Sequence, residues 1–323
     1  MIRPIVVPLD GSDLAQAALP RAAVLARVLN APIHLVRVHV PVLAYSAAES
    51  PVAFPDPAWD ARVRESVHQW LAKTTSDAKV RLNVPVTFEL RVGTPADEVV
   101  AAARERNARM IVCTTHGHGG WAPQWIGSVA DAFIRHAPCP VLAMTESAAG
   151  REGEDMKHIL VPLDGSNTAA AIIPHVRELA LAAKGTVDLY RVVAPPWVGD
   201  ALTAVRSGHV DRFGVDPAAD VAKVELDRVA DDLRYAGVHA TTCVEVATNP
   251  IRAILDRIEE TKPDLVAMST HGRGLSRLFV GSVADKVLRG GGRPVFCRRP
   301  PQDVRDEAEP ARMFATSVSG PAA

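Results

Sequence analysis

Two stretches of this 323-residue sequence combine glycine, serine and histidine in a pattern that suits the binding of an anion. The first, "CTTHGHGGWAPQWIGSVAD", spans 113–131, and the second, "MSTHGRGLSRLFVGSVAD", spans 268–285. Glycine tolerates positive φ angles and lets main-chain N–H groups approach an anion closely. Each stretch ends in a Gly-Ser pair that should open a helix, whose first N–H groups and positive dipole end attract phosphate. The predicted chemistry is phosphate binding by backbone N–H groups and a serine hydroxyl.

An acidic residue follows the first apolar run of each half of the chain. Asp10 ends "IVVPLD" and Asp164 ends "ILVPLD". In an open parallel sheet, ligands bind beyond the carboxyl ends of the strands, which places these carboxylates and the glycine-rich stretches at one edge. Phosphate on the loop and a ribose or base near the carboxylate favour a nucleotide. The competing interpretation is structural, because Asp followed by Gly-Ser also forms an Asx turn at a helix start.

Other chemistries have less support. The sequence has no G-x-x-x-x-G-K-[ST] motif, no G-x-G-x-x-G after the first strand and no G-x-S-x-G. His116, His118 and His271 invite a metal interpretation, but Arg273 replaces His118 in the second stretch and no carboxylate has ligand spacing nearby. The four cysteines include no Cys-x-x-Cys pair. We therefore predict neither a metal site nor a disulfide framework.

The sequence is an internal duplication. "IVVPLDGS" at 5–12 returns as "ILVPLDGS" at 159–166, and this offset of 159 − 5 = 154 recurs over most of each half. The length exceeds the ~100 to 200 residues of a typical single core, so two domains are expected. We place a first domain at 1–147, a linker at 148–156, a second domain at 157–299 and a disordered tail at 300–323.

Within each half, short apolar runs alternate with longer amphipathic stretches, which predicts an α/β fold with a parallel sheet between helices. Pro20 and Pro174 fall inside the first helices and predict a kink or a late helix start. The proline-rich stretch 41–57 is expected to be a mobile surface loop. For the first half we predict strands at 5–9, 33–40, 86–93, 110–114 and 140–144, and helices at 13–30, 58–80, 95–107 and 128–137.

The overall charge offers nothing that would attract a polyanion. The chain has 36 basic and 37 acidic residues and a net charge of −1, which leaves no field for a nucleic acid or an anionic membrane surface. No run of about 18 apolar residues occurs, and the N-terminus has no signal-peptide pattern. We expect a cytoplasmic protein that binds neither nucleic acid nor membranes.

These motifs resemble the universal stress protein (UspA-like) family, in a tandem arrangement that covers about 1–145 and 157–299. The resemblance rests on "VPLDGS" and "THG" in both halves, "GTP" at 93–95, "HAPCPVL" at 136–142, and "GSVADKVL" and "RPVF" in the second half. It implies a five-stranded parallel sheet of order 3-2-1-4-5 between helices in each half. It also implies that the domains pair through their last strands, 140–144 and 294–298, with a homodimer as a further assembly. The implied ligand is ATP, ADP or AMP, with Mg²⁺ on the phosphates.

In nucleotide-binding members of the family the phosphate motif is Gly-x2-Gly-x9-Gly-(Ser/Thr). Its later positions fall on Gly117, Gly127 and Ser128, with nine residues between the glycines, but Thr114 stands where the first glycine belongs. In the second half Ser269 replaces the first glycine. The hydroxyl of Thr114 or Ser269 could donate to a phosphate in place of a closely approaching backbone N–H. The added side chain could instead push the phosphates away.

The second half departs further from the motif, since only eight residues separate Gly272 from Gly281. The first half is therefore the stronger candidate for nucleotide binding. The resemblance assigns the nucleotide contacts to Pro8, Asp10, Val38, Cys113, Thr114, Gly117, Gly127, Ser128 and Val129, and to Pro162, Asp164, Val192, Met268, Ser269, Gly272, Gly281, Ser282 and Val283.

Two alternatives stay open beside a stress-response binding and signalling protein. One is a structural or regulatory interaction module of the same fold that holds no nucleotide. The other is a slow ATPase, for which His116 is the one candidate general base. We predict no catalytic residue.

Overall fold

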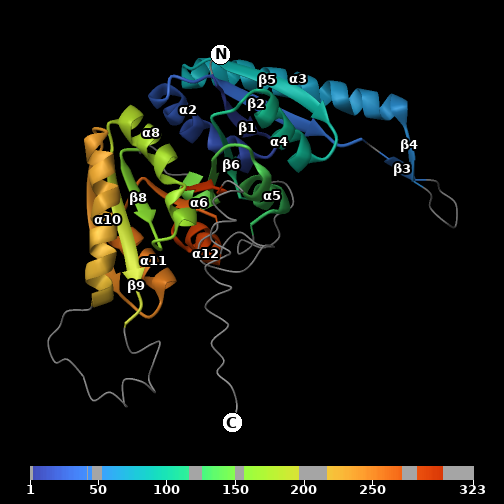
Figure 1. Cartoon of the computed structure of the whole chain (residues 1–323). Coiled ribbons are helices and arrows are strands. Elements are labelled where there is room, and N and C mark those ends of the chain that lie inside the picture. The colour runs from blue at the N-terminus through green and yellow to red at the C-terminus, as the bar shows by residue number, and fades with distance from the viewer. Residues whose placement is uncertain are drawn as a thin grey trace, which may run out of the picture. The chain divides into compact units, whose positions relative to one another are not determined.

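The computed structural model describes residues 3–41, 43–45, 53–115, 126–149, 156–195, 217–270 and 282–300. The chain divides into two compact units, 1–152 and 153–323. Figure 1 shows their elements in sequence colours. Each unit is an α/β fold built on a parallel sheet, as the alternation of apolar runs and amphipathic stretches predicts.

The first unit has five parallel strands in the order β5-β2-β1-β6-β7. In chain order this is 3-2-1-4-5, so the predicted topology is confirmed. The strand order reverses between the neighbours β1 and β6, which opens a crevice beyond their carboxyl ends. The strands are β1 (Ile5–Pro8), β2 (Ile33–His39), β5 (Val86–Val92), β6 (Met110–Thr114) and β7 (Val141–Met144).

Helices cover the first sheet in two groups. The helix α2 packs against α3, and α4 packs against α5. The crossovers of a parallel sheet require such layers on its faces. The helices are α1 (Asp13–Gln16), α2 (Ala18–Val28), α3 (Pro57–Leu82), α4 (Pro95–Glu105), α5 (Ser128–His136) and α6 (Glu146–Ala149).

The second unit repeats this plan in the order β10-β9-β8-β11-β12. Its strands are β8 (His158–Pro162), β9 (Thr186–Val193), β10 (His239–Val246), β11 (Leu265–Ser269) and β12 (Val295–Arg298). Its helices are α7 (Asn167–Ala170), α8 (Ile173–Ala183), α10 (Pro217–Tyr235), α11 (Pro250–Thr261) and α12 (Ser282–Gly290). The duplication in the sequence is thus a duplication of the fold.

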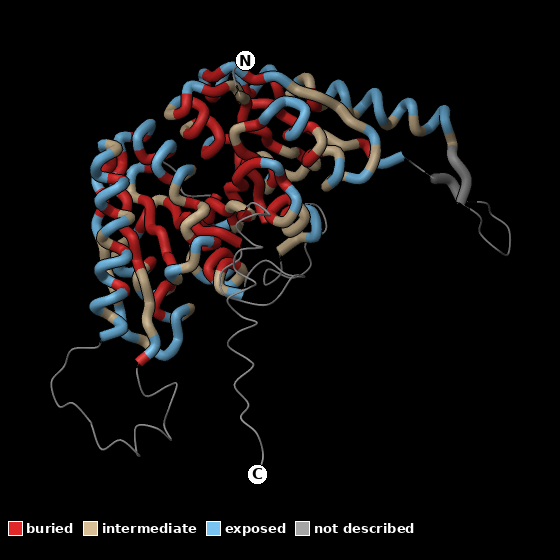
Figure 2. Tube along the Cα trace, in the orientation of Figure 1, coloured by how far each residue is buried: buried red, intermediate tan, exposed pale blue. Residues whose placement is uncertain are grey.

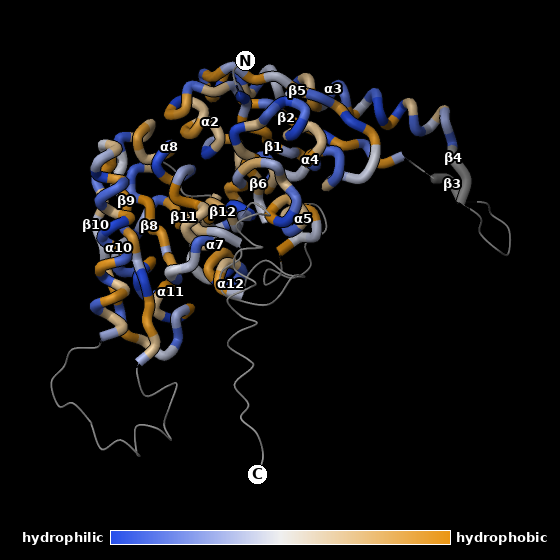
Figure 3. The backbone as a smooth tube through the Cα atoms, in the orientation of Figure 1, coloured by the Kyte–Doolittle hydropathy of each residue, from blue (hydrophilic) through white to orange (hydrophobic). Residues whose placement is uncertain are grey.

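The core of each unit lies on its strands. Ile5, Val6 and Val7 of β1 are completely buried, and Figure 2 shows the central strands buried along most of their length. Figure 3 shows hydrophobic stretches, drawn in orange, on central strands such as β8. Strands covered on both faces need nearly continuous apolar runs, which explains why the sequence pattern located them.

Pro20 delays the first helix, as predicted. The expected helix 13–30 is divided at Ala17, and Pro20 is the third residue of α2, where its missing N–H is not needed. Pro174 lies at the second residue of α8 in the same way. Asn30 leaves the helical region with a φ of 48°.

One expectation for an irregular segment needs correction. Within 41–57, β3 (Leu43–Tyr45) and β4 (Ala53–Pro55) pair as antiparallel strands, with Ala44 opposite Phe54. The prolines do not prevent this, because a two-stranded ladder leaves one side of each strand unpaired. The linker 148–156 stays a prediction: α6 continues to Ala149, and 150–155 lie outside the described residues. Nearly all of the expected tail, 301–323, lies outside the described residues.

Candidate functional site

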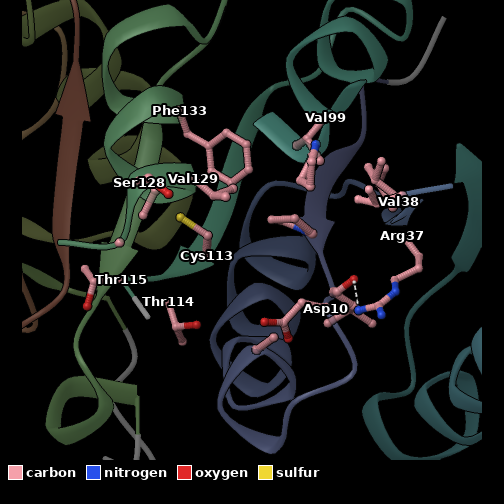
Figure 4. A pocket seen from close by; sticks show the side chains of 18 residues that line it. Asp10, Arg37, Val38, Val99, Cys113, Thr114, Thr115, Ser128, Val129 and Phe133 are labelled. Carbon is pink, nitrogen blue, oxygen red and sulfur yellow. Dashed lines mark hydrogen bonds between the residues drawn. The ribbon is translucent and has the colours of Figure 1, made fainter. Parts of the chain in front are cut away.

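A pocket of about 530 Å³ lies at the carboxyl edge of the first unit's sheet. Its lining comes from the ends of β1, β2 and β6, from α1, and from the N-terminal halves of α4 and α5. Figure 4 shows side chains from these elements converging on it. This volume is within the range of small-molecule sites, roughly 300–1,000 Å³.

Most of the predicted contacts of the first half meet in this pocket. Pro8, Asp10, Val38, Cys113, Thr114, Gly127, Ser128 and Val129 all line it. Gly117 lies outside the described residues. The residues are far apart in sequence, and the reversal of strand order at β1 and β6 brings them together. Their contact with a nucleotide remains a prediction.

Asp10 begins a tight turn at the pocket. Gly11 has a φ of 88°, which L-residues with a side chain rarely adopt. The Oδ1 atom of Asp10 accepts hydrogen bonds from the Ser12 amide at 2.9 Å and the Ser12 hydroxyl at 2.6 Å. Ser12 then caps α1 by accepting from the Ala15 amide at 3.1 Å. The Asx-turn interpretation is therefore correct for Oδ1, while the carboxylate still lines the pocket.

The N-terminus of α5 forms the opposite side of the pocket. Gly127 is the N-cap, and its amide donates to the Thr115 carbonyl at 2.7 Å. With no side chain at the cap, no side-chain hydrogen bond closes this end. Ser128, the first helical residue, is exposed. The first-turn N–H groups, the helix dipole and the serine hydroxyl together suit an anion such as phosphate.

Apolar side chains form the rest of the pocket wall. Val36 and Val38 come from β2, Val99 from α4, and Cys113 and Phe133 from β6 and α5. Figure 4 shows Val38 and Val99 on one side of the pocket and Cys113 and Phe133 on the other. An apolar slot with a few polar groups at its rim suits a flat base joined to a polar chain.

Arg37 lines the pocket as well, and the sequence analysis did not predict it. Its Nη1 donates to the Leu9 carbonyl at 3.2 Å, and its guanidinium carbon lies 5.8 Å from the centre of the Trp70 ring. Burial lowers the pKa of Arg37, and the charge of Asp10 acts in the opposite direction. An arginine keeps its charge in such surroundings. The one available signal was a cationic residue within the apolar run "IHLVRVHV".

In the second unit the described site residues occupy the same places in the fold. Pro162 ends β8, Val192 lies in β9, and Met268 and Ser269 end β11. The Asp164 turn repeats the first, with Oδ1 accepting from the Ser166 amide at 2.9 Å and hydroxyl at 2.6 Å. Ser282 and Val283 open α12, whereas Gly272 and Gly281 lie outside the described residues.

Ser269 uses its hydroxyl within the protein. The Oγ atom of Ser269 donates to the Ala169 carbonyl at 3.2 Å, and its residue is buried. A hydroxyl held in this way is not directed at a phosphate. The departure from glycine at this position therefore works against the second unit as a nucleotide site.

The part of the chain that the structure describes contains no group of three or more His, Cys, Asp or Glu side chains that could hold a metal ion. His116, His118 and His271 lie outside the described residues. No described helix combines the length and the apolar character needed to cross a membrane.

The pocket and the repeated fold agree with what the sequence resembles. A model of the "Universal stress protein family" matches residues 1–144 and 156–299. The chain belongs to the universal stress protein family. Both matched segments coincide with the repeated units of this tandem universal stress protein.

Known members of the family share the tandem architecture. The universal stress protein Rv2005c of Mycobacterium tuberculosis is 29% identical over 307 residues, covering 91% of this chain and 96% of the relative. The crystal structure of a universal stress protein from Archaeoglobus fulgidus covers 92% of this chain and 98% of its own, with a TM-score of 0.67 and 17% identity. That likeness is one of fold.

One solved universal stress protein was crystallised in complex with cAMP. It is 23% identical and covers 45% of this chain, with a TM-score of 0.34. At this distance the likeness says nothing about the ligand of this chain.

Proposed function

We propose that the first unit of this universal stress protein binds ATP or a related adenine nucleotide. One observation carries the proposal: an apolar slot, a carboxylate and an uncapped helix N-terminus meet in a single pocket. The base would lie between the side formed by Val38 and Val99 and the side formed by Cys113 and Phe133. The ribose would lie near Asp10, and the phosphates at Gly127 and Ser128. The described residues fit the group, since each part of a nucleotide finds a chemically matching wall.

Mg²⁺ would accompany the phosphates and neutralise part of their charge when the nucleotide is bound. The residues of this chain would hold and orient the ligand and exclude water from its base. No described pocket residue is placed as a general base, and His116 lies outside the described residues. The proposal is therefore a binding and signalling protein in the cytoplasm, in which nucleotide occupancy is read by a partner. Slow ATP hydrolysis is not part of it.

Domain pairing belongs to the same proposal. The last strands β7 and β12 carry buried apolar residues such as Leu142 and Phe296. Pairing of these strands inside one chain would give an internal dimer of domains, and a homodimer of the whole chain would be a further assembly. Nucleotide occupancy in the first unit could then act on the assembly.

The second unit supports a different role. Ser269 directs its hydroxyl to the Ala169 carbonyl, and the loop before Ser282 is one residue shorter than in the first half. We propose that this unit serves mainly as a structural or regulatory module of the same fold.

Calorimetric titration of the whole protein with Mg-ATP tests the function. We expect a dissociation constant below about 1 mM for the wild type. Ser128→Asp places a carboxylate at the N-terminus of α5, where it repels phosphate, and affinity should fall at least about 100-fold.

Ser76→Asp is the matched control. Ser76 is exposed in α3, and its hydroxyl donates to the Ala72 carbonyl at 3.0 Å, away from the pocket. This variant adds the same charge and should bind like the wild type. A wild-type protein that binds neither ATP, ADP nor AMP below the millimolar range would overturn the proposal.

A further inference from the structure

The two units hold corresponding arginines beside the Asp-Gly-Ser turn. Arg37 lies in β2 and Arg191 in β9, one repeat offset apart (191 − 37 = 154). Each guanidinium lies over the glycine of its turn. An added Cβ at Gly11 would be 3.5 Å from Nη1 of Arg37, and one at Gly165 would be 2.5 Å from Nη2 of Arg191. Both cations thus lie at the carboxyl edge, next to the aspartate of the turn, but in different positions.

The helix above each arginine presents a different side chain. Arg37 lies under the ring of Trp70 on α3, and its Nε atom is buried with no hydrogen-bond partner in the described part of the chain. Arg191 instead forms an ion pair with Glu225 on α10, at 2.5 Å from Nη1 to Oε2.

Trp70 and Glu225 occupy the same place on their helices. The buried residues of α3 include Leu71, Thr75 and Ala78, and those of α10 include Leu226, Ala230 and Leu233. Each pair differs by 155 positions, and 225 − 70 = 155 as well. The exchange of an aromatic ring for a carboxylate is therefore a substitution at one structural position.

This substitution changes the charge near the site. In the first unit Asp10 and Arg37 sum to zero, and the arginine retains hydrogen-bond donors at the pocket. In the second, Asp164, Arg191 and Glu225 sum to −1, and the arginine already has a carboxylate partner. A nucleoside triphosphate carries several negative charges, so one additional negative charge within about 10 Å should weaken its binding on the order of 3-fold, before the lost donors of the arginine are counted.

We infer that Trp70 and Glu225 determine which unit accepts the nucleotide, by leaving Arg37 available to an anionic ligand and neutralising Arg191. Trp70 is a positioning residue, since it acts through Arg37. Arg37 is then a binding residue for the ligand, in addition to the N-terminus of α5. This inference rests on the proposed nucleotide function and states which of the two units performs it.

Exchanging the two side chains tests the inference on the full-length chain, by calorimetry with Mg-ATP. Trp70→Glu should give Arg37 a carboxylate partner and weaken binding at least about 10-fold, a loss typical of a charge-assisted contact. Trp59→Glu is its control. Trp59 lies on the same helix, is 46% exposed and makes no contact with Arg37 among the described interactions. This control should leave the affinity within about two-fold of the wild type.

Glu225→Gln tests the second unit independently and preserves side-chain shape at a half-exposed position. In the Ser128→Asp background, which blocks the first unit, it should raise the affinity for ATP at least about 5-fold by freeing Arg191. Asp231→Asn is the matched control, since it removes the same charge from α10 at its ion pair with Arg234. It should not raise the affinity.

The outcomes separate the two proposals. If wild type does not bind ATP, the proposed function fails, and this inference fails with it. If wild type binds ATP but Trp70→Glu, folded by circular dichroism, keeps its affinity, only the inference is overturned. The inference alone is also overturned if calorimetry shows that both units of the wild type bind ATP with equal affinity. The same holds if Glu225→Gln raises the affinity for ATP no more than its control does.

Discussion

Asp10 serves both the turn and the proposed ligand. Its Oδ1 holds the Ser12 amide and hydroxyl, while the carboxylate borders the pocket. Because an amide oxygen accepts the same two hydrogen bonds, Asp10→Asn should leave the free energy of unfolding within about 1 kcal/mol of wild type. The variant loses a charged acceptor for the ribose, which is expected to weaken ATP binding about 10-fold.

Removing that carboxylate also makes the pocket less negative, which favours a polyphosphate. A screened charge near the phosphates contributes less free energy than a direct hydrogen bond to a charged group. The loss of the hydrogen bond from the ribose should therefore outweigh the gain from the removed negative charge. Denaturant unfolding and calorimetry measure the two effects separately. Tighter ATP binding by Asp10→Asn would show that Asp10 makes no contact with the ribose.

At the scale of residues, the sequence located one kind of pocket residue and missed another. Asp10 and Ser128 follow from their places at a strand end and a helix start, which a parallel sheet brings to one edge, and Cys113 follows from the family resemblance. Arg37 could not be found in this way. Its role depends on Trp70, which lies over it from α3, and such a tertiary neighbour leaves no local pattern.

At the scale of elements, β2, β5 and the C-terminal end of α4 enclose a partly buried polar cluster in the first unit. The Nδ1 atom of His34 lies 2.8 Å from the Thr87 hydroxyl, and its Nε2 lies 3.2 Å from Glu89. Burial would raise the pKa of Glu89, but hydrogen bonds from Arg106, Arg91 and His34 outweigh it and lower the value to about 2. This cluster ties the edge strand to its neighbour.

His34 makes the first unit sensitive to acid. Its side chain is 2% exposed, and burial, followed by the charge of Arg106, lowers its pKa below the ordinary 6.5. The unfolded chain therefore binds a proton more readily, and stability present above pH 6.5 is lost as the pH falls through the folded pKa. His34→Gln should flatten this part of the stability curve, as urea unfolding between about pH 7.5 and 5.5, one unit either side of 6.5, would show.

The second unit supplies an internal comparison for that experiment. Asp188 occupies the position of His34 (188 − 34 = 154) and pairs with Arg257 at 2.8 Å. The second unit therefore has no imidazole at this position. An unchanged pH slope in His34→Gln would contradict the assignment of acid sensitivity to this cluster.

The elements themselves were largely predictable. Strands buried on both faces must be apolar throughout, so β1 and β6 were located to within a residue. The short pair β3 and β4 was missed because prolines and small residues at 41–57 have a loop composition. Helix ends were less accurate, since the break at Ala17 depends on the Ser12 cap and Pro20 together.

At the scale of the whole molecule, the duplication predicts that the two units stay associated. A protease site inserted between Gly150 and Arg151 would allow cleavage of the folded chain. If β7 and β12 pair as proposed, the halves should elute together in size-exclusion chromatography after cutting. Elution as two separate fragments, each folded by circular dichroism, would contradict domain pairing.

The duplicated fold also allowed one copy to diverge. Glu225 paired with Arg191, the internal hydrogen bond of Ser269 and a shortened loop all occur in the second unit. The first unit keeps a pocket with apolar walls, Arg37 and an uncapped helix N-terminus. A tandem protein can thus retain one ligand site while the other unit contributes structure.

The most direct test of the central claim is mass spectrometry of the small molecules released by denaturing freshly purified, full-length protein. The account predicts an adenine nucleotide, close to one per chain, that is absent from Ser128→Asp and present in the Ser76→Asp control. Release of no nucleotide, from protein that also takes up none of the ATP, ADP or AMP added to it, would contradict the account.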